Sequence, residues 1–500
     1  MRALQRTVSD LYPGRGRVLA TLGFCLAGML FAGCAVNPVT GQQNLVLMSE
    51  SEEISVGRQY HPKILQQYGR YADEALQSYV QQVGTRLAEN SHRSELVYRF
   101  TVLDSTDVNA FALPGGYIYI TRGLMAYLDS EAELAAVLGH EIGHVTARHG
   151  VRQQSAAQVA GAGMVVAQIL LPELRAGAAE QLYSVLSQAI LSGYGREHEL
   201  ESDRLGAEYL ARTGYPPQSM LGVLRVLKAQ EAYAAEVAEQ SGQRIQTYHG
   251  LFATHPDNDR RLQEVVSEAL PLYAGIEADE RRGAYLKKID GMVFGDSPAQ
   301  GVRRGNRFFH EQLGIAVTFP EHWHLSNQPQ QVVSAHPGGE ATLVMLADDI
   351  NRKIPPERFL TERLGLQVTA GTELQGDLPG YTGRARVRTG QGEQLARVSV
   401  LYVDQTAYLF VGLVRDTNAL ANFEPAFLDA ARSLHRLTDE ERAAAQPLRI
   451  ALVRAEAGTT YAALAERSPL TGLVESQLRL LNQHYPQGDP ESGQWLKVVR

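Results

Sequence analysis

The chain has 500 residues, enough for about three domains of ordinary size. It carries 55 acidic and 47 basic side chains, which gives a formal net charge of −8. This acidic balance argues against nucleic-acid binding, since such proteins depend on clustered positive charge. The two cysteines, Cys25 and Cys34, both lie near the N-terminus, which excludes a disulfide-stabilised scaffold and a thiolate metal site.

The first 33 residues have the pattern of an export signal. Four arginines precede an apolar run of about 15 residues, which is short for a membrane span of roughly 20. The run ends in Phe31-Ala-Gly-Cys34, which resembles a bacterial lipobox with Phe31 where leucine is usual. The resemblance implies a signal peptide over residues 1–33, lipidation of Cys34 and, because Ala35 follows, anchoring at the periplasmic face of the outer membrane. The alternative is a signal anchor that stays attached.

Two helices are predicted before the first strands. Ser49 followed by Glu52 indicates a capping box at the start of one helix, and the pattern over residues 73–88 is typical of another. Strands are expected at residues 97–103 and 117–121.

The second of these strands is a candidate substrate-binding element. It follows Gly115-Gly116 and contains Tyr117, Ile118 and Tyr119. An exposed edge there would take an extended substrate chain by strand addition, a mode that reads the backbone and favours unfolded substrates. The alternative is an ordinary strand inside a sheet.

Helical spacing of apolar residues continues from Ser130 onward. Ser130 with Glu133 indicates a second capping box, and Gly150 suits the end of this helix.

This helix carries the most specific motif of the chain, His140-Glu-Ile-Gly-His144. Four residues advance a helix by roughly 400°, so the two imidazoles lie about 40° apart on one face and can share a metal ion. Glu141 then lies beside the metal, where it can take a proton from a bound water. On a continuous helix His149 lies about 140° further around, so it is not expected to be the third ligand.

A later helix that ends near Gly214 offers carboxylates at helical spacing. Glu199 can bind the metal, and Asp203, one turn later, can accept the N–H of a ligating imidazole. Glu197 and Glu201 form a rival pair at the same spacing. Spacing alone does not choose between the two pairs.

Taken together and in this order, these motifs resemble the HtpX, CAAX-prenyl-endopeptidase and BepA family of gluzincin metallopeptidases. The resemblance covers about residues 37–270 and includes the lead-in over residues 109–121 and Thr254-His255-Pro256 with Arg261.

The resemblance implies one Zn²⁺ per chain, bound by His140, His144 and Glu199, because the family's ligating glutamate stands four residues before Asp203. It implies amide hydrolysis with Glu141 as the general base.

His255 has two candidate roles. It can donate to the developing oxyanion, or it can bind zinc as a fourth ligand that keeps the enzyme latent. A turn-capping histidine before a proline is the structural alternative.

The leading hypothesis is a periplasmic, lipid-anchored zinc endopeptidase that cleaves misfolded or stalled envelope proteins. The expected partners are unfolded or misassembled envelope proteins, the membrane through the lipid, and peptidoglycan, with no nucleic acid. One alternative is a latent protease that serves as a chaperone or assembly factor, and another is a binding protein tethered to the cell wall.

The expected fold class is α+β multidomain. A mainly helical zincin-type domain with a small sheet is expected over residues 34–295, followed by a linker at 296–305. Residues 306–437 alternate as strands with two helical stretches, which indicates an α+β domain with an antiparallel sheet and no assigned role. Residues 448–500 have a βααβ order that resembles a LysM-type glycan-binding module, although Thr459 stands where aspartate is usual. A structural βααβ cap is the alternative.

Overall fold

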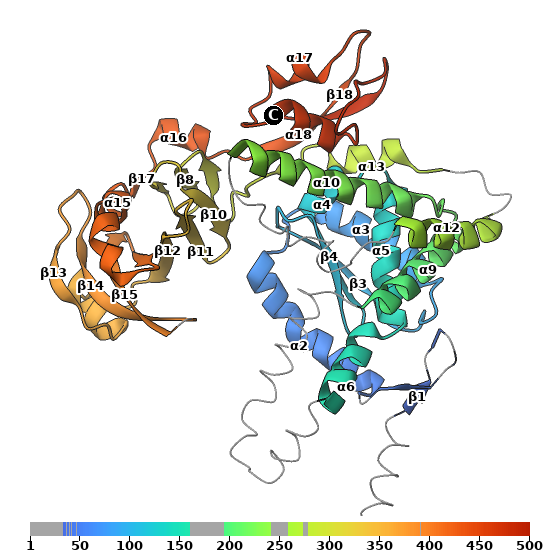
Figure 1. Ribbon diagram of the computed structural model, residues 1–500, viewed down its shortest axis with the longest axis horizontal. Coiled ribbons are helices and arrows are strands. Elements are labelled where there is room, and N and C mark those ends of the chain that lie inside the picture. The colour runs from blue at the N-terminus through green and yellow to red at the C-terminus, as the bar shows by residue number, and fades with distance from the viewer. Residues whose placement is uncertain are drawn as a thin grey trace, which may run out of the picture.

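The computed structural model describes residues 34–160, 195–241, 259–273 and 279–500, apart from Asn37, Thr40, Gln42, Leu47 and Gln391. Figure 1 shows a central body, a lobe at the left and a C-terminal lobe seated above the body. Helices and sheets occur together in several packed units, as the sequence predicted. The proposed signal segment and His255 lie outside the described residues.

The central body contains most of the helices. Its elements are β1 (Cys34–Val36), β2 (Gln43–Leu45), α2 (Glu50–Tyr68), α3 (Glu74–Ala88), β3 (Arg99–Leu103), β4 (Ala110–Leu113), β5 (Tyr117–Thr121), α4 (Arg122–Tyr127), α5 (Glu131–Thr146), α6 (His149–Ala160), α9 (Arg196–Arg212), α10 (Ser219–Ser241), α12 (Asp259–Tyr273), α13 (Arg282–Ile289) and β6 (Val293–Phe294).

One of the two predicted capping boxes is complete. Ser49 Oγ accepts from the Glu52 amide at 3.3 Å, and the Glu52 carboxylate accepts from the Ser49 amide. At the start of α5, Ser130 Oγ accepts from the Glu133 amide at 3.1 Å, but the Glu133 carboxylate accepts from the Asp129 amide instead. The second box is therefore only half formed, because the preceding turn offers Glu133 a different donor.

The prediction of an exposed substrate strand over residues 117–121 is wrong. In the three-stranded sheet the order is β3-β5-β4, so β5 is the central strand, parallel to β3 and antiparallel to β4. Tyr117, Ile118 and Tyr119 are all buried. Over a run as short as this one, apolar except for Thr121, a central strand and an edge strand have the same sequence pattern, and only the pairing with neighbouring strands distinguishes them. Among the described strands, β3 and β4 form the two edges of this sheet.

The helix α5 runs through the main hydrophobic core. Every one of its residues except His140 is buried. Apolar side chains of α3, α5, α9 and the small sheet form this core, among them Val80, Ile118, Leu134, Leu138 and Leu210. A helix that is buried on all sides holds its side chains in fixed positions, which suits a site that depends on geometry.

The helix α5 ends four residues earlier than predicted. Its last residue is Thr146, and the chain then turns through Arg148, which has a positive φ of 57°, before α6 begins at His149. A left-handed conformation costs a non-glycine residue roughly 1–2 kcal/mol. Arg148 offsets this cost with bonds from its guanidinium to Glu53 Oε2 at 3.1 Å and to the Met48 carbonyl at 2.8 Å.

The left-hand lobe in Figure 1 is an antiparallel α+β unit. Its elements are β7 (Val302–Arg304), β8 (Arg307–His310), β9 (Ile315–Thr318), β10 (His324–Gln328), β11 (Gln331–Ala335), β12 (Ala341–Asp349), α14 (Pro356–Arg358), the π-turn Phe359–Arg363, β13 (Thr369–Glu373), β14 (Gly380–Thr389), β15 (Gly392–Val403), β16 (Thr406–Val414), the 3₁₀ turn Thr417–Ala419, α15 (Leu420–Arg432), β17 (His435–Arg436) and α16 (Asp439–Ala444).

This lobe holds a seven-stranded sheet in the order β10-β11-β12-β16-β15-β14-β13 and a four-stranded sheet in the order β17-β9-β8-β7. The predicted linker at 296–305 is shorter than expected. Its last part forms β7, which pairs with β8 and belongs to the smaller sheet. The second half of the lobe's first helical stretch is a π-helix, since α14 (Pro356–Arg358) continues directly into Phe359–Arg363.

The C-terminal unit has the predicted strand–helix–helix–strand order. It consists of β18 (Leu448–Arg454), α17 (Tyr461–Ala465), α18 (Val474–Leu481) and β19 (Trp495–Val499). Its sheet is shared with the central body, because β18 pairs with β19 on one side and with β6 on the other. Ile450, Leu481 and Val499 belong to the main core.

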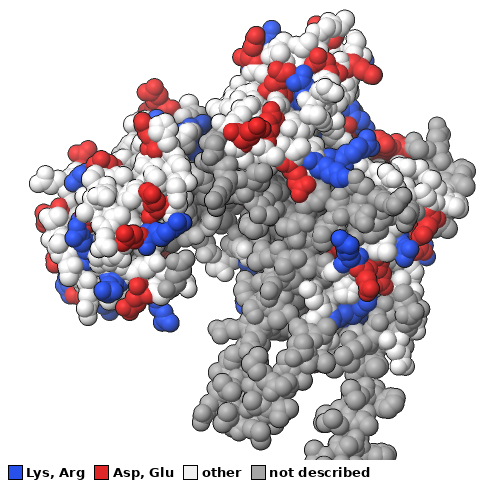
Figure 2. Space-filling model, viewed as in Figure 1, with Lys and Arg blue, Asp and Glu red and all other residues white. Residues whose placement is uncertain are grey.

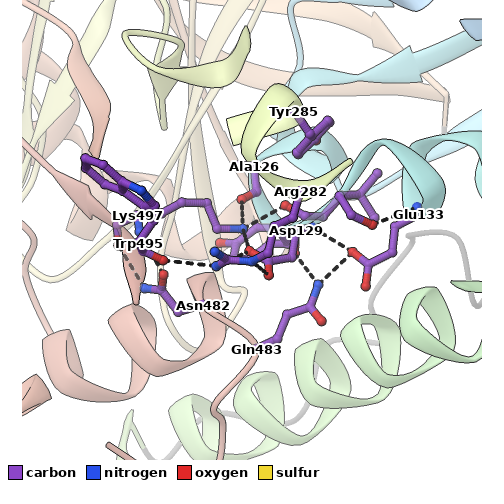
Figure 3. Close-up of polar contacts among 12 residues, drawn as sticks. Ala126, Asp129, Glu133, Arg282, Tyr285, Asn482, Gln483, Trp495 and Lys497 are labelled. Atoms are coloured by element: carbon purple, nitrogen blue, oxygen red, sulfur yellow. Dashed lines mark hydrogen bonds and ion pairs between the residues drawn. The ribbon is translucent and has the colours of Figure 1, made fainter. Parts of the chain in front are cut away.

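A polar cluster joins this unit to the turn between α4 and α5 (Figure 3). The Lys497 side chain is fully buried, and its amine donates to the carbonyls of Ala126 at 3.0 Å and Leu128 at 2.7 Å. Gln483 donates to the Glu133 carboxylate at 2.8 Å. Arg282 pairs with Asp129 and donates to the Trp495 carbonyl at 3.0 Å. The C-terminal unit is therefore bonded to the residues that start α5.

The described surface is mixed in charge. Figure 2 shows acidic and basic side chains interspersed over the two outer lobes on the face seen there. Within the part of the chain that the structure describes, no helix combines the length and the hydrophobicity that crossing a membrane requires.

Candidate metal centre

Small residues bring α5 and α9 into close contact. A Cβ added to Gly143 would lie 2.9 Å from the Ser202 carbonyl oxygen, and one added to Gly206 would lie 3.0 Å from the main-chain nitrogen of His140. Gly139 also faces Gly206. Glycines four residues apart on one helix leave a groove into which the other backbone fits. This approach brings the carboxylates of α9 to the two histidines of α5.

The closeness of the helices makes Gly143 a sensitive position. Substituting Gly143 by Val is expected to weaken metal binding at least about 10-fold and to destabilise the fold by about 1–3 kcal/mol, because the new side chain must push α9 away from α5. Metal content after dialysis and thermal unfolding measure the two effects. Gly283, on the exposed side of α13, has open space around its Cβ position. Gly283→Ala is the control and should leave metal content unchanged; a Gly143→Val protein with normal metal content would contradict the packing argument.

Three side chains converge at this contact. His140 Nε2 lies 3.0 Å from His144 Nε2 and 3.5 Å from Glu199 Oε2, and His144 Nε2 lies 3.6 Å from Glu199 Oε1. Ligand atoms at about 2.0–2.1 Å from a tetrahedral ion lie about 3.3–3.4 Å apart. The observed separations are close to that spacing. Two imidazoles and a carboxylate are also the donor set that a zinc ion accepts, so these residues fit a metal ion.

Two residues of α9 hold His140 in place. Asp203 Oδ1 lies 2.9 Å from His140 Nδ1, which directs His140 Nε2 toward the cluster. Ser202 Oγ donates to the His140 carbonyl at 2.7 Å. Burial opposes protonation of His140, but the hydrogen bonds to Asp203 and Glu199 outweigh burial and hold the pKa of His140 well above its ordinary value. The site therefore attracts positive charge.

Glu141 is buried next to these ligands on α5. A small cavity of about 10 Å³ is lined by Leu113, Pro114 and His144, among others, so the end of the edge strand β4 lies beside the cluster. The site thus combines a group of candidate metal ligands, a neighbouring carboxylate and an edge strand whose end lies beside His144.

The structure also separates the rival carboxylates. Glu197 is exposed, and Glu201 contacts His149 and Arg152 rather than the histidine pair. Glu199, with 1% of its surface exposed, is the acid that meets both histidines. His255 lies outside the described residues, and Cys34 is the first residue of β1.

Sequence reasoning missed His149. On a continuous helix His149 would point away from the histidine pair, but the turn at Arg148 brings His149 Nδ1 to 2.8 Å from His144 Nδ1. No local signal marks this turn, because an arginine is an unusual residue for a left-handed conformation.

The fold and the site together define a metallopeptidase domain: a core helix with two histidines and a glutamate, and a second helix with the third candidate ligand. Residues 74–269 match Peptidase family M48, so the chain carries an M48 peptidase domain and the resemblance drawn from its motifs is confirmed.

The curated relatives are peptidases as well. The chain is 30% identical over 271 residues to the beta-barrel assembly-enhancing protease of Yersinia pestis, covering 50% of this chain and 53% of that protein. It is 28% identical over 229 residues to the protein of the same name from Escherichia coli K12, covering 44% and 45%. It is 30% identical over 200 residues to the mitochondrial metalloendopeptidase OMA1 of Arabidopsis thaliana, covering 38% and 36%. The chain spans about half the length, or less, of these relatives.

Proposed function

We propose that this protein is a zinc-dependent endopeptidase of the bacterial cell envelope that cleaves misfolded or stalled envelope proteins. The observation that carries the proposal is the meeting of His140, His144 and Glu199 at separations that suit one tetrahedral ion. A zinc ion bound there would lower the pKa of a water and polarise the scissile carbonyl.

The chain's own residues would do the rest of the chemistry. Glu141 takes the proton from the attacking water and returns it to the leaving amine. Asp203 keeps His140 in the tautomer that presents Nε2. The edge strand β4, in place of β5, pairs with an extended segment of the substrate, which restricts cleavage to unfolded or loop regions.

The location and the domain roles extend this proposal. Cleavage before Cys34 and lipidation of that residue would anchor the protein at the periplasmic face of the outer membrane. The proposal divides the chain into three domains: a peptidase domain over 34–295, an α+β domain over 306–437 and a LysM-like module over 448–500. It also includes a contact between the LysM-like module and peptidoglycan. His255 keeps its two candidate roles, oxyanion donor or fourth ligand of a latent enzyme.

A second candidate is an assembly factor for envelope proteins. The relatives from Yersinia pestis and Escherichia coli are named for enhancing β-barrel assembly, and the lobe over 302–444 adds a large sheet that the chemistry at α5 does not use. Zinc binding without turnover of any unfolded substrate would favour this candidate over the peptidase.

The direct test uses the purified mature protein and casein. We expect zinc-dependent degradation that a chelator stops and added zinc restores. Glu199→Ala should lower zinc affinity on the order of 100-fold or more and abolish degradation, because the third ligand is lost. Glu197→Ala, an exposed carboxylate on the same helix, is the matched control and should behave as the wild type. Equal zinc affinity in both variants would refute the assignment of Glu199.

A further inference from the structure

The His144 ring contacts a different partner on each of its two nitrogens. Nε2 faces His140 and Glu199, the candidate metal ligands. Nδ1 lies 2.8 Å from Nδ1 of His149, which is fully buried at the start of α6. The outer ring nitrogen of a ligating histidine usually donates to a carboxylate or a carbonyl. Here it meets a second imidazole.

The contact continues to a carboxylate on α9. His149 Nε2 lies 3.0 Å from Glu201 Oε2, and the same oxygen accepts from Arg152 Nη1 at 2.7 Å. Glu201 and the ligand candidate Glu199 are two residues apart on one helix, so they point to different sides of it. Glu199 reaches His144 directly, whereas Glu201 reaches it through His149.

The positions of the protons in this series of hydrogen bonds follow from the geometry. A nitrogen that binds a metal carries no proton, so a neutral His144 that ligates through Nε2 has its proton on Nδ1 and donates it to His149. His149 can accept at Nδ1 only when its own proton is on Nε2, where it donates to Glu201.

We propose that His149 and Glu201 are positioning residues for His144: Glu201 selects the tautomer of His149, and His149 in turn holds the His144 ring with Nε2 directed at the metal. The inference rests on the proposed function, since it assigns the partner of one of its ligands. The two histidines of the motif are then oriented by different groups. His140 is oriented by the carboxylate of Asp203, and His144 by a carboxylate acting through an imidazole.

A purely structural role is the competing explanation. The Arg152–Glu201 pair and the stacking of His149 on His198, with ring centroids 4.3 Å apart, also hold α6 against α9. A structural role would affect the stability of the metal-free protein, whereas a positioning role would affect metal affinity. The two effects are separable by choosing side chains with and without an acceptor.

The experiment measures the zinc dissociation constant of the full mature chain by competition with a chromogenic chelator, beside the melting temperature of the zinc-free protein. His149→Leu removes the acceptor and is expected to weaken zinc binding about 10–100-fold. His149→Gln keeps a carbonyl oxygen that can accept from His144 Nδ1 and an amide that can donate to Glu201, so it should recover most of the affinity. Glu201→Ala should weaken binding, and Glu197→Ala should not.

The outcomes separate the inference from the function on which it rests. A wild-type protein that fails to bind zinc overturns both. A wild-type protein that binds zinc, with His149→Leu binding equally well or with His149→Gln and His149→Leu equally impaired, overturns the positioning role alone. A lower melting temperature of zinc-free His149→Leu with an unchanged dissociation constant assigns the residue to the structure and overturns the inference as well.

Discussion

Glu141→Gln is expected to lower the turnover of casein by about 10²–10⁴-fold while zinc stays bound. Glutamine has nearly the same shape as glutamate, so the buried position can accept it without a cavity. Its amide cannot take the proton of the attacking water. The loss should therefore appear in kcat rather than in metal content.

Metal analysis and casein degradation on the same preparation measure this prediction. Glu197→Gln, at an exposed position of α9, is the matched control for a glutamate-to-glutamine change and should keep wild-type turnover. Zinc-dependent degradation by Glu141→Gln at close to the wild-type rate would mean that another group accepts the proton. The endopeptidase proposal would then need a different general base.

Lys497→Met is expected to lower the free energy of unfolding by about 2–4 kcal/mol at neutral pH. The Lys497 amine donates to two carbonyls, that of Ala126 at the end of α4 and that of Leu128 in the turn that precedes α5, and each buried carbonyl without a donor costs about 1–3 kcal/mol. Methionine has a similar length and no donor. Because this turn starts the helix that carries the candidate ligands, zinc affinity should fall with stability.

The size of this effect is expected to depend on pH. Burial lowers the pKa of Lys497 from 10.5 to about 8. The folded protein therefore loses this proton before the unfolded chain does, and the contribution of Lys497 to stability grows as the pH rises from about 8 toward 10.5. The neutral amine still has two protons for the two carbonyls.

Denaturant unfolding of wild type and Lys497→Met at pH 7 and at about pH 9.5 checks both statements, since the difference between the proteins isolates this group. Lys287, exposed on α13, gives the control Lys287→Met, which should change stability by less than about 0.5 kcal/mol. A Lys497→Met protein as stable as the control would show that the buried amine does not hold the turn.

The Lys497 contacts affect how the C-terminal unit can be studied. Its strand β18 continues a sheet of the central body, and its apolar residues lie in the main core. Deleting residues 448–500 would expose that core and disturb the start of α5. Substitutions on the exposed face of the unit are therefore the sounder test of a contact with peptidoglycan.

Several features of the site follow from short stretches of sequence. The spacing of His140 and His144 places them one turn apart on any helix, and the same holds for Glu199 and Asp203, because backbone hydrogen bonds set the helical period. The capping residue Ser49 likewise acts on an amide three residues away. Such features depend on local geometry, which the sequence alone determines.

Other features required the packing of segments far apart in the chain. The choice of Glu199 over Glu201 depends on which face of α9 meets α5. The interior position of β5 depends on its two neighbours, and the contact of His149 with His144 depends on a turn at Arg148 that Glu53 stabilises from about a hundred residues away.

By itself, then, the sequence determined the class of chemistry, because that chemistry needs particular side chains at helical spacing within single elements. Only the tertiary structure decided which of the equally spaced acids joins the histidines, which strand lies inside the small sheet, and that the last fifty residues are bonded to the central body. Contacts between elements decide these features, because close packing allows one arrangement and the local periodicity of the sequence does not show which one it is.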